Sequence, residues 1–480
     1  MEVISRLSFV RCWQPGVSSY VKADSKVIIV DPDSDALRGR LSVLRRLHAG
    51  IALSFVGSAF NQGSTFALNL LVANLVGRYA FGEFTVVQST LATAATIGQF
   101  ATGYTATKHI AEFRERDPQR ASRILHLCNR VSTVTATLTA GALLFGAPFI
   151  ATTALGVPAA VTSLRIAALA VLFVVMNGFR SGALAGLESY HALARVGIVS
   201  GTIYLLVGAC GTAVGGVPGA LVGIGLSAGA QWTILGRALR RELARHGLTA
   251  QSDAWTERQT LIRFALPASL AGLISLPAIW WALAILTRQP NGLNEIALFG
   301  AANSFRVIVM FLPGVLTTVG MSLLNNQRGS SAKSYRWVFW WTLALTATCA
   351  AVAATLIVVL GPMLFQAFGK DFGPAYAPLR VLMIAAVIEA IAIAIYQVIQ
   401  TQGRMWLTLF LISVPRDALI VGLAYALTPT SGAVGLSAAI ALGWTLALVV
   451  ITVLAFRLWQ TPTNYKVQNE FNPTYDGTSH

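Results

Sequence analysis

The chain has 480 residues, of which 55% are hydrophobic and only 11% are charged. An ordinary globular domain carries about a quarter charged residues, so this composition argues against a soluble enzyme and for a protein whose solvent is lipid. The formal net charge of +16 would suit nucleic-acid binding, but the basic residues form no stripe with interleaved aromatics. We therefore expect an all-α membrane protein without a nucleic-acid partner.

Apolar runs long enough to cross a bilayer recur from Gly50 to Leu458. Because these runs are continuous and do not alternate apolar with polar residues, they predict helices and not the strands of a barrel. About 12 spans are predicted. Their approximate bounds are Gly50–Leu75, Glu83–Ala106, Cys128–Ile150, Ser163–Gly186, Val196–Thr212, Pro218–Gly236, Leu261–Leu286, Ile296–Leu324, Trp337–Leu360, Leu379–Thr401, Met405–Leu427 and Gly432–Phe456.

The basic residues outside these spans predict the orientation of the chain. Of the 35 Lys and Arg residues, about 25 fall in the termini and in alternate loops, and about three fall in the opposite loops. Multi-pass membrane proteins keep their Lys-rich and Arg-rich loops in the cytoplasm. Both termini are therefore expected to be cytoplasmic.

The polar segment that follows the sixth span divides the apolar region into two halves. The predicted organisation is a polar cytoplasmic tail (1–47), a first lobe of helices 1 to 6 (48–236), a cytoplasmic linker (237–260), a second lobe of helices 7 to 12 (261–458) and a cytoplasmic tail (459–480). Each half places a Phe-Gly pair, Phe81-Gly82 or Phe299-Gly300, at a short outer turn before a long span. A parallel repeat of this kind is a recurring transporter plan, with the substrate site between the halves.

Five short segments carry a family resemblance. They are Leu75–Ser89 with the following Gly98, Lys108–Asp117, Leu184–His191, Phe264–Pro267 and Gln402–Arg404. In order and spacing across about Arg45 to Trp459, they resemble the polysaccharide and O-antigen flippases. Those proteins belong to the multidrug, oligosaccharidyl-lipid and polysaccharide exporter superfamily.

The resemblance implies two six-helix lobes around a central cavity, and alternating access that moves a lipid-linked (polyprenyl-diphosphate) oligosaccharide to the outer leaflet of the cell (inner) membrane. It implies transport without covalent chemistry. We expect no cofactor and no metal. The expected partners are the lipid-linked oligosaccharide, membrane lipids, and the machinery that polymerises and exports the polysaccharide.

Charged residues inside spans are the first candidates for a substrate site, because burying a charge in a bilayer is expensive. Five such residues are predicted to lie in the cavity, and they are Arg180, Arg306, Glu389, Arg416 and Asp417. At about 1.5 Å rise per residue, both Arg416 and Glu389 reach roughly 15 to 16 Å into antiparallel helices, close to the bilayer midplane. Pro415, directly before Arg416, is expected to kink its helix.

Two interpretations of these charges stay open. In one, Arg416 and Arg306 contact a diphosphate, because guanidinium groups match phosphate oxygens. In the other, Glu389 and Arg416 form an ion pair that only joins two helices. Arg306 has no acidic residue nearby in its own span, which favours exposure to the cavity, whereas Arg180 lies near a helix end and can extend to the interface.

Uncharged polar residues in the spans are further candidates. The residues predicted to line a path for sugars are Asn61, Gln62, Asn69, Asn74, Gln88, Gln99 and Asn303, although such residues more often hydrogen-bond neighbouring helices. A cation-coupled multidrug exporter of the same superfamily is the nearest alternative function, but its embedded acid is expected in the first half, where the first span has none. A membrane glycosyltransferase or polymerase needs a large outer loop, and the outer loops here are short.

Overall fold

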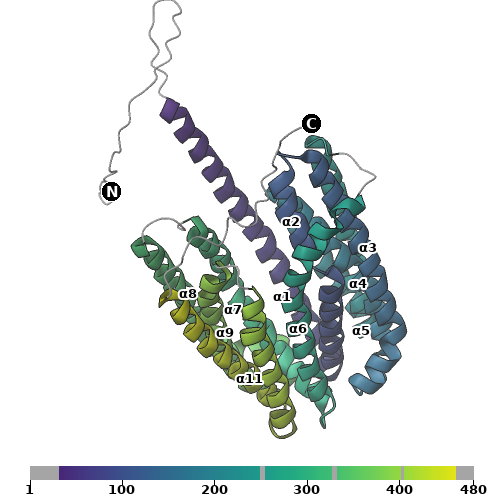
Figure 1. Cartoon of the computed structure of the whole chain (residues 1–480). Coiled ribbons are helices and arrows are strands. Elements are labelled where there is room, and N and C mark those ends of the chain that lie inside the picture. The colour runs from purple at the N-terminus through teal and green to yellow at the C-terminus, as the bar shows by residue number, and fades with distance from the viewer. Residues whose placement is uncertain (1–31, 249–253, 327–331, 402–404, 461–480) are drawn as a thin grey trace, which may run out of the picture. The chain divides into compact units, whose positions relative to one another are not determined.

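Every regular element of the described chain is helical. The computed structural model describes residues 32–248, 254–326, 332–401 and 405–460, and no strand occurs among them. The α-helices are α1 (Pro32–Gln99), α2 (Thr102–Phe113), α3 (Pro118–Phe149), α4 (Ala160–Gly186), α5 (Tyr190–Arg245), α6 (Arg258–Thr287), α7 (Gly292–Asn326), α8 (Ala332–Phe368), α9 (Tyr376–Thr401), α10 (Met405–Thr408) and α11 (Val414–Gln460) (Figure 1). Short π-helical or 3₁₀ turns lie at Ile150–Ala154, Ala254–Glu257, Lys370–Ala375 and Leu409–Ser413.

The chain divides into two units, Met1–Ala49 and Gly50–His480. In the first unit, the part that the structure describes is helical from Pro32 onward, so the end of the predicted polar tail is helix. The Gln402–Arg404 motif and most of the predicted C-terminal tail lie outside the described residues. The predicted domain boundaries stay a prediction.

Glycines break the three longest helices. Gly77 in α1 has φ 79°, Gly216 in α5 has φ 57° and Gly432 in α11 has φ 51°. A positive φ costs little energy only for glycine, because other residues carry a Cβ that clashes there. Each of the three helices is therefore two helical segments joined at a kink. The kinks at Gly77 and Gly216 fall between two predicted spans, and the kink at Gly432 falls at the first residue of the last predicted span.

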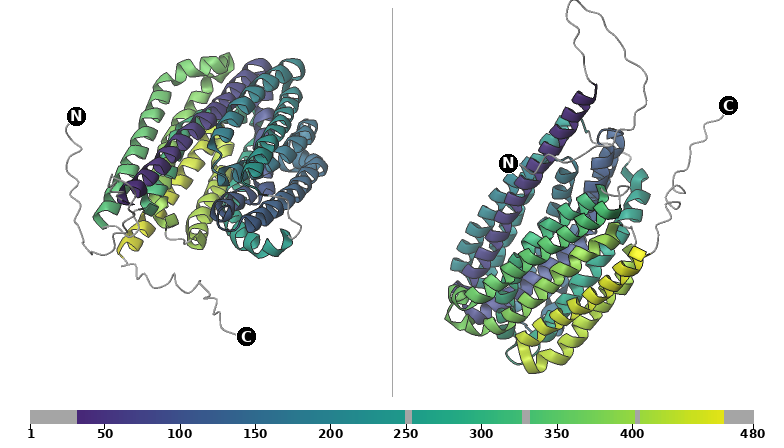
Figure 2. Two further views of the ribbon diagram at one scale, coloured as in Figure 1. Left: turned by 90° about the horizontal axis from the view of Figure 1, so that it is seen from above. Right: turned by 90° about the vertical axis from the view of Figure 1, so that its left-hand side faces the viewer.

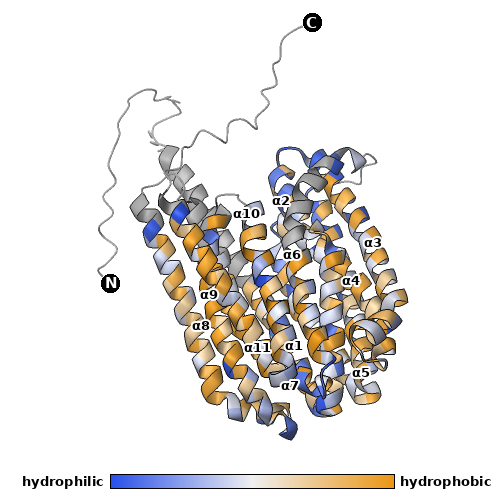
Figure 3. Ribbon diagram, turned by 60° about the horizontal axis from the view of Figure 1, so that its bottom comes forward, coloured by the Kyte–Doolittle hydropathy of each residue, from blue (hydrophilic) through white to orange (hydrophobic). Residues whose placement is uncertain are grey.

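Eight helices in the described residues are long and apolar enough to cross a membrane. Figure 3 shows hydrophobic residues along most of the length of α3, α4 and α8, and hydrophilic residues at helix ends near α2 and α7. The chain is an all-α membrane protein, as the sequence predicts. The exact number of 12 spans stays a prediction.

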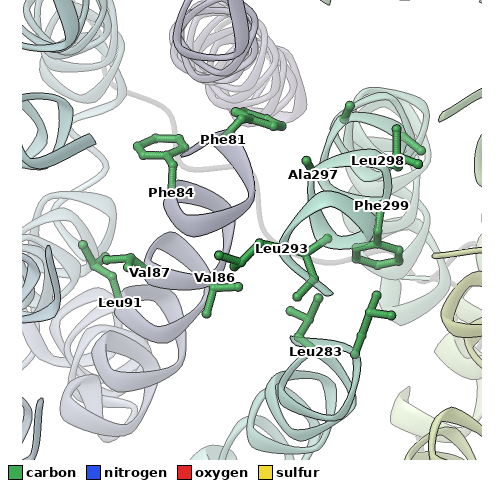
Figure 4. Packing of buried hydrophobic residues seen from close by; sticks show 14 of the residues in the cluster. Phe81, Phe84, Val86, Val87, Leu91, Leu283, Leu293, Ala297, Leu298 and Phe299 are labelled. Carbon is green, nitrogen blue, oxygen red and sulfur yellow. The ribbon is translucent and has the colours of Figure 1, made fainter. Parts of the chain in front are cut away.

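Within the second unit, the helices pack in two groups. In the first lobe α4 packs against α2, α3 and α5, and in the second lobe α9 packs against α7, α8 and α11 (Figure 2). One apolar cluster continues from the first lobe into the second, and includes Val86, Val87, Leu283 and Leu293. Figure 4 shows this part of α1 lying beside the start of α7, with Leu283 of α6 close to both.

The two Phe-Gly pairs of the predicted repeat lie at this contact between the lobes. A Cβ added to Gly82 would collide with the backbone of Leu293, and a Cβ added to Gly300 would lie 2.7 Å from the Thr85 side chain. Each glycine thus lets one lobe approach the other closely. Trp280 Nε1 donates a hydrogen bond to Thr90 Oγ1 at 2.8 Å across the same contact.

Candidate functional site

A first charged cluster joins α7 to α9 in the second lobe. Arg306 Nη2 donates to Glu389 Oε2 at 2.5 Å, and Arg306 Nη1 donates to Asn303 Oδ1 at 3.1 Å. Asn303 and Arg306 lie three residues apart and so share one face of α7. The side chains of Arg306 and Glu389 are 16% and 11% exposed, so this is a largely buried ion pair.

The pairing of Arg306 corrects two expectations from the sequence. Arg306 was expected to face the cavity because its own span offers no acidic residue nearby, but it pairs with Glu389 on a different helix and is largely buried. Glu389 was expected to face Arg416 if it formed a pair, and this pairing is wrong. The reason is that α9 packs against both α7 and α11, and the side of α9 that carries Glu389 meets α7.

Polar atoms in and beside this cluster have unused hydrogen-bonding capacity. Arg306 Nε and Asn69 Oδ1 are buried, and neither has a hydrogen-bond partner among the described residues. Asn69, on α1, donates through Nδ2 to Ser304 Oγ at 3.3 Å, so the two lobes meet next to Asn303. Most buried polar atoms in proteins are paired. An unpaired donor and an unpaired acceptor in this region suit a polar ligand.

A second charged cluster joins α6 to α11. Arg416 Nε donates to Asp417 Oδ1 at 2.7 Å and Arg416 Nη2 donates to Ser275 Oγ at 2.8 Å. Ser275 Oγ in turn donates to Asp417 Oδ2 at 2.7 Å. The Arg416 guanidinium also lies over the Trp444 ring, 4.4 Å from its centroid. Arg416, Asp417 and Ser275 therefore all contact one another. This arrangement favours the interpretation that Arg416 joins two helices, here α6 and α11.

The remaining predicted site residues lie apart from both clusters, in the first lobe. Arg180 stacks 4.2 Å above the Trp232 ring and donates to the Trp232 carbonyl oxygen. Gln88 Nε2 contacts the Tyr204 hydroxyl at 3.5 Å. Both arrangements are typical of contacts between helices of one lobe. Asn61 is exposed, and its side chain makes no hydrogen bond to a described residue.

Ser275 is a member of these clusters that the sequence prediction missed. A single serine in an apolar span is common and usually bonds its own helix, so Ser275 gives no distinct signal. Asn69 gives a better signal, since it is an amide in the middle of the first predicted span.

A third set of polar contacts links the lobes beside the first kink. Arg78 Nε donates to the Asn294 carbonyl at 3.2 Å, and Arg78 Nη2 lies 3.7 Å from Glu295 Oε1. Glu295 Oε2 accepts a hydrogen bond from the Ala433 N–H at 2.8 Å, directly after the kink at Gly432. A cavity of about 720 Å³ opens here, lined by both lobes.

Comparison with known proteins places this chain in a family. The family model described as polysaccharide biosynthesis protein matches residues 47–324. The chain belongs to this family. The predicted resemblance to polysaccharide flippases of the multidrug, oligosaccharidyl-lipid and polysaccharide exporter superfamily is confirmed.

A curated relative of this family member comes from Ralstonia nicotianae. It is named EPS I polysaccharide export inner membrane protein EpsE, and it is 26% identical over 72% of this chain and 79% of its own length. A protein of the same name from Ralstonia solanacearum is 22% identical over the same shares.

Solved transporter structures share the fold. An inward-facing multidrug resistance MATE family transporter aligns with a TM-score of 0.69 at 17% identity, covering 84% of this chain and 98% of its own. The lipid II flippase MurJ in an inward closed conformation also aligns at 0.69, with 13% identity over 86% of this chain and 88% of its own. The chain shares the fold of these transporters, and the family and curated relatives that it matches are named for polysaccharide biosynthesis and export.

Proposed function

We propose that this protein moves a lipid-linked oligosaccharide, carried on polyprenyl diphosphate, from the cytoplasmic to the outer leaflet by alternating access. The observation that carries the proposal is the buried Arg306 with its unpaired Nε, next to the point where α1 of the first lobe meets α7. Charged groups within spans mark substrate pathways or buried pairs. Arg306 is paired with Glu389, and its Nε–H remains available to donate a hydrogen bond to a ligand.

A diphosphate fits this donor chemically. It carries several acceptor oxygens, and the planar guanidinium presents its donors in a fixed fork that suits them. Glu389 would hold Arg306 in place and balance its charge while no substrate is bound. Asn303 and Asn69 would contact hydroxyl or phosphate oxygens nearby. These roles involve binding and release only, so the proposal includes no covalent chemistry and no enzyme activity.

Alternating access requires contacts between the lobes that can open and close. The contacts of Gly82 and Gly300, and those of Arg78 with Asn294 and Glu295, lie close along the chain to the kink at Gly77 and to the start of α7. These parts of the chain are predicted to be on the outer side. We therefore assign these contacts to the closed outer end of a central cavity that opens toward the cytoplasm, with both termini cytoplasmic.

The alternative is a cation-coupled multidrug exporter, because the fold is shared with MATE family transporters. The carboxylates of Glu389 and Asp417 are the groups that a coupling cation would use. Glu389 is already paired with Arg306 at 2.5 Å and Asp417 with Arg416 at 2.7 Å. Because an arginine occupies each carboxylate in place of a cation, this pairing favours the flippase.

The deciding experiment measures lipid-linked sugars in a strain that lacks this protein. Loss of a flippase should leave lipid-linked oligosaccharide on the cytoplasmic side and remove the surface polysaccharide, and full-length protein should reverse both. A drug exporter would instead change drug tolerance and leave the lipid-linked sugars unaltered. Normal polysaccharide export in the deletion strain would remove the proposal.

A further inference from the structure

A basic pocket lies in the first lobe between the two segments of α5, away from both charged clusters. Its volume is about 570 Å³. The start of α5 contributes His191 and Arg195, and the end of α5 contributes Arg237, Arg241 and Arg245. Residues four apart share one face of a helix. Because α5 reverses at Gly215 and Gly216, two basic stripes far apart in the sequence line one pocket.

The pocket keeps a positive charge after its acidic residues are counted. Glu188 lies 2.8 Å from Arg114 Nη2 and Glu242 lies 2.7 Å from Arg245 Nη1, so both carboxylates are already neutralised. Arg195, Arg237 and Arg241 are exposed, and they have no acidic partner among the side chains that the structure describes. Three arginines with available N–H donors line one pocket, and this arrangement is suited to binding an anion.

The pocket continues into apolar surface along the same helix. Val199 lines it and is exposed, and Leu206 and Leu226 are exposed farther along the two segments. The opposite face of the first segment is covered, because Gly197 and Gly201 pack closely against α1. The open side therefore points away from the packing partners of α5. In membrane-length helices such a surface is covered by lipid chains.

We propose that this pocket binds the phosphate headgroup of an anionic membrane phospholipid, whose acyl chains lie along Val199, Leu206 and Leu226. Basic pockets between helices on the cytoplasmic side are suited to acidic lipid headgroups, since the cytoplasmic leaflet is negatively charged. The loop that contains Arg241 is predicted to be cytoplasmic, so the pocket meets that leaflet. The site is separate from the Arg306 cluster and does not depend on the transported substrate.

The test uses the purified full-length protein and native mass spectrometry. The probes are phosphatidylglycerol, which is anionic, phosphatidylcholine, which is zwitterionic, and inorganic phosphate. Wild-type protein should retain phosphatidylglycerol in preference to phosphatidylcholine. The Arg237→Gln, Arg241→Gln double variant should bind phosphatidylglycerol about thirtyfold more weakly, because two charged contacts are lost.

A charge-matched control separates the pocket from general positive charge. Arg116 and Arg130 are exposed and do not line the pocket, so the Arg116→Gln, Arg130→Gln variant should bind phosphatidylglycerol like the wild type. Equal lipid loss in both double variants overturns the proposal, as does equal retention of the two lipids by the wild type. Binding of inorganic phosphate at the same arginines without a preference for lipid overturns it in favour of a soluble anion. Thermal melting checks that both variants are folded.

Discussion

Arg306 Nη2 donates to Glu389 Oε2 at 2.5 Å, and this ion pair joins α7 to α9 inside the apolar part of the second lobe. Its consequence is that neither residue can be changed alone without stranding the other charge in a poorly hydrated setting. Loss of export by a single variant is therefore ambiguous, because it can follow from misfolding. Each single variant at this site therefore has to be compared with the double variant.

The Arg306 and Glu389 pair provides the first prediction. Glu389→Gln and Arg306→Met alone should each cost about 3 to 5 kcal/mol of stability, because each leaves one buried charge unpaired. The double variant should recover membrane abundance. It should not recover polysaccharide export, since the guanidinium itself contacts the diphosphate. Abundance is measured by immunoblot of membranes and export by surface polysaccharide. Full export by the double variant would falsify the role of Arg306.

The closed cluster on α11 provides the second prediction, which concerns stability. Asp417→Asn should destabilise the protein by about 3 to 5 kcal/mol, because it leaves the Arg416 charge unbalanced. Ser275→Ala should cost less, about 1 to 3 kcal/mol, because Arg416 and Asp417 still contact each other directly. Thr445→Ala on the same helix is the control, since Thr445 is exposed and bonds only its own helix. Thermal melting in detergent ranks the three, and equal melting of Asp417→Asn and Thr445→Ala contradicts the assigned contacts.

The glycine at the contact between the lobes provides the third prediction. Gly82→Ala places a methyl group against the Leu293 backbone, and such overpacking costs about 1 to 3 kcal/mol. Gly63→Ala, on the same helix with open space around it, should be neutral or slightly stabilising because alanine favours helix. Thermal melting and export are compared for the two. If Gly82→Ala is as stable and as active as Gly63→Ala, the close approach of the lobes is not required.

The orientation of the chain provides the fourth prediction. In a background without native cysteines, Val214→Cys should react with a membrane-impermeant thiol reagent in intact cells, because it is exposed beside the kink of α5. Arg241→Cys, near the end of the second segment of α5 and far from the kink, should react only after permeabilisation. The loop charges are the physical reason for this difference. Strong labelling of Arg241→Cys in intact cells would reverse the assigned orientation.

The sequence by itself determines that this chain belongs in lipid and is helical. Composition and continuous apolar runs are local properties, and a bilayer accepts few backbone structures, so no tertiary information is needed. The Phe-Gly pairs at residues 81–82 and 299–300 were also visible as a repeat. Their role was not visible in the sequence. Gly82 packs against the backbone of Leu293, and Gly300 packs against the side chain of Thr85, in each case on the other lobe.

Only the tertiary structure decided which charges meet. Glu389 lies on α9, which packs against both α7 and α11. Its partner therefore depends on the rotation of α9 about its axis and on the depth at which each arginine lies. Order along the chain favoured Arg416, the next charged residue on the following predicted span, whereas packing brings Arg306 to Glu389 and gives Arg416 to Asp417 and Ser275. Helix rotation is set by the sum of many apolar contacts along α9, and no single residue in the sequence encodes it.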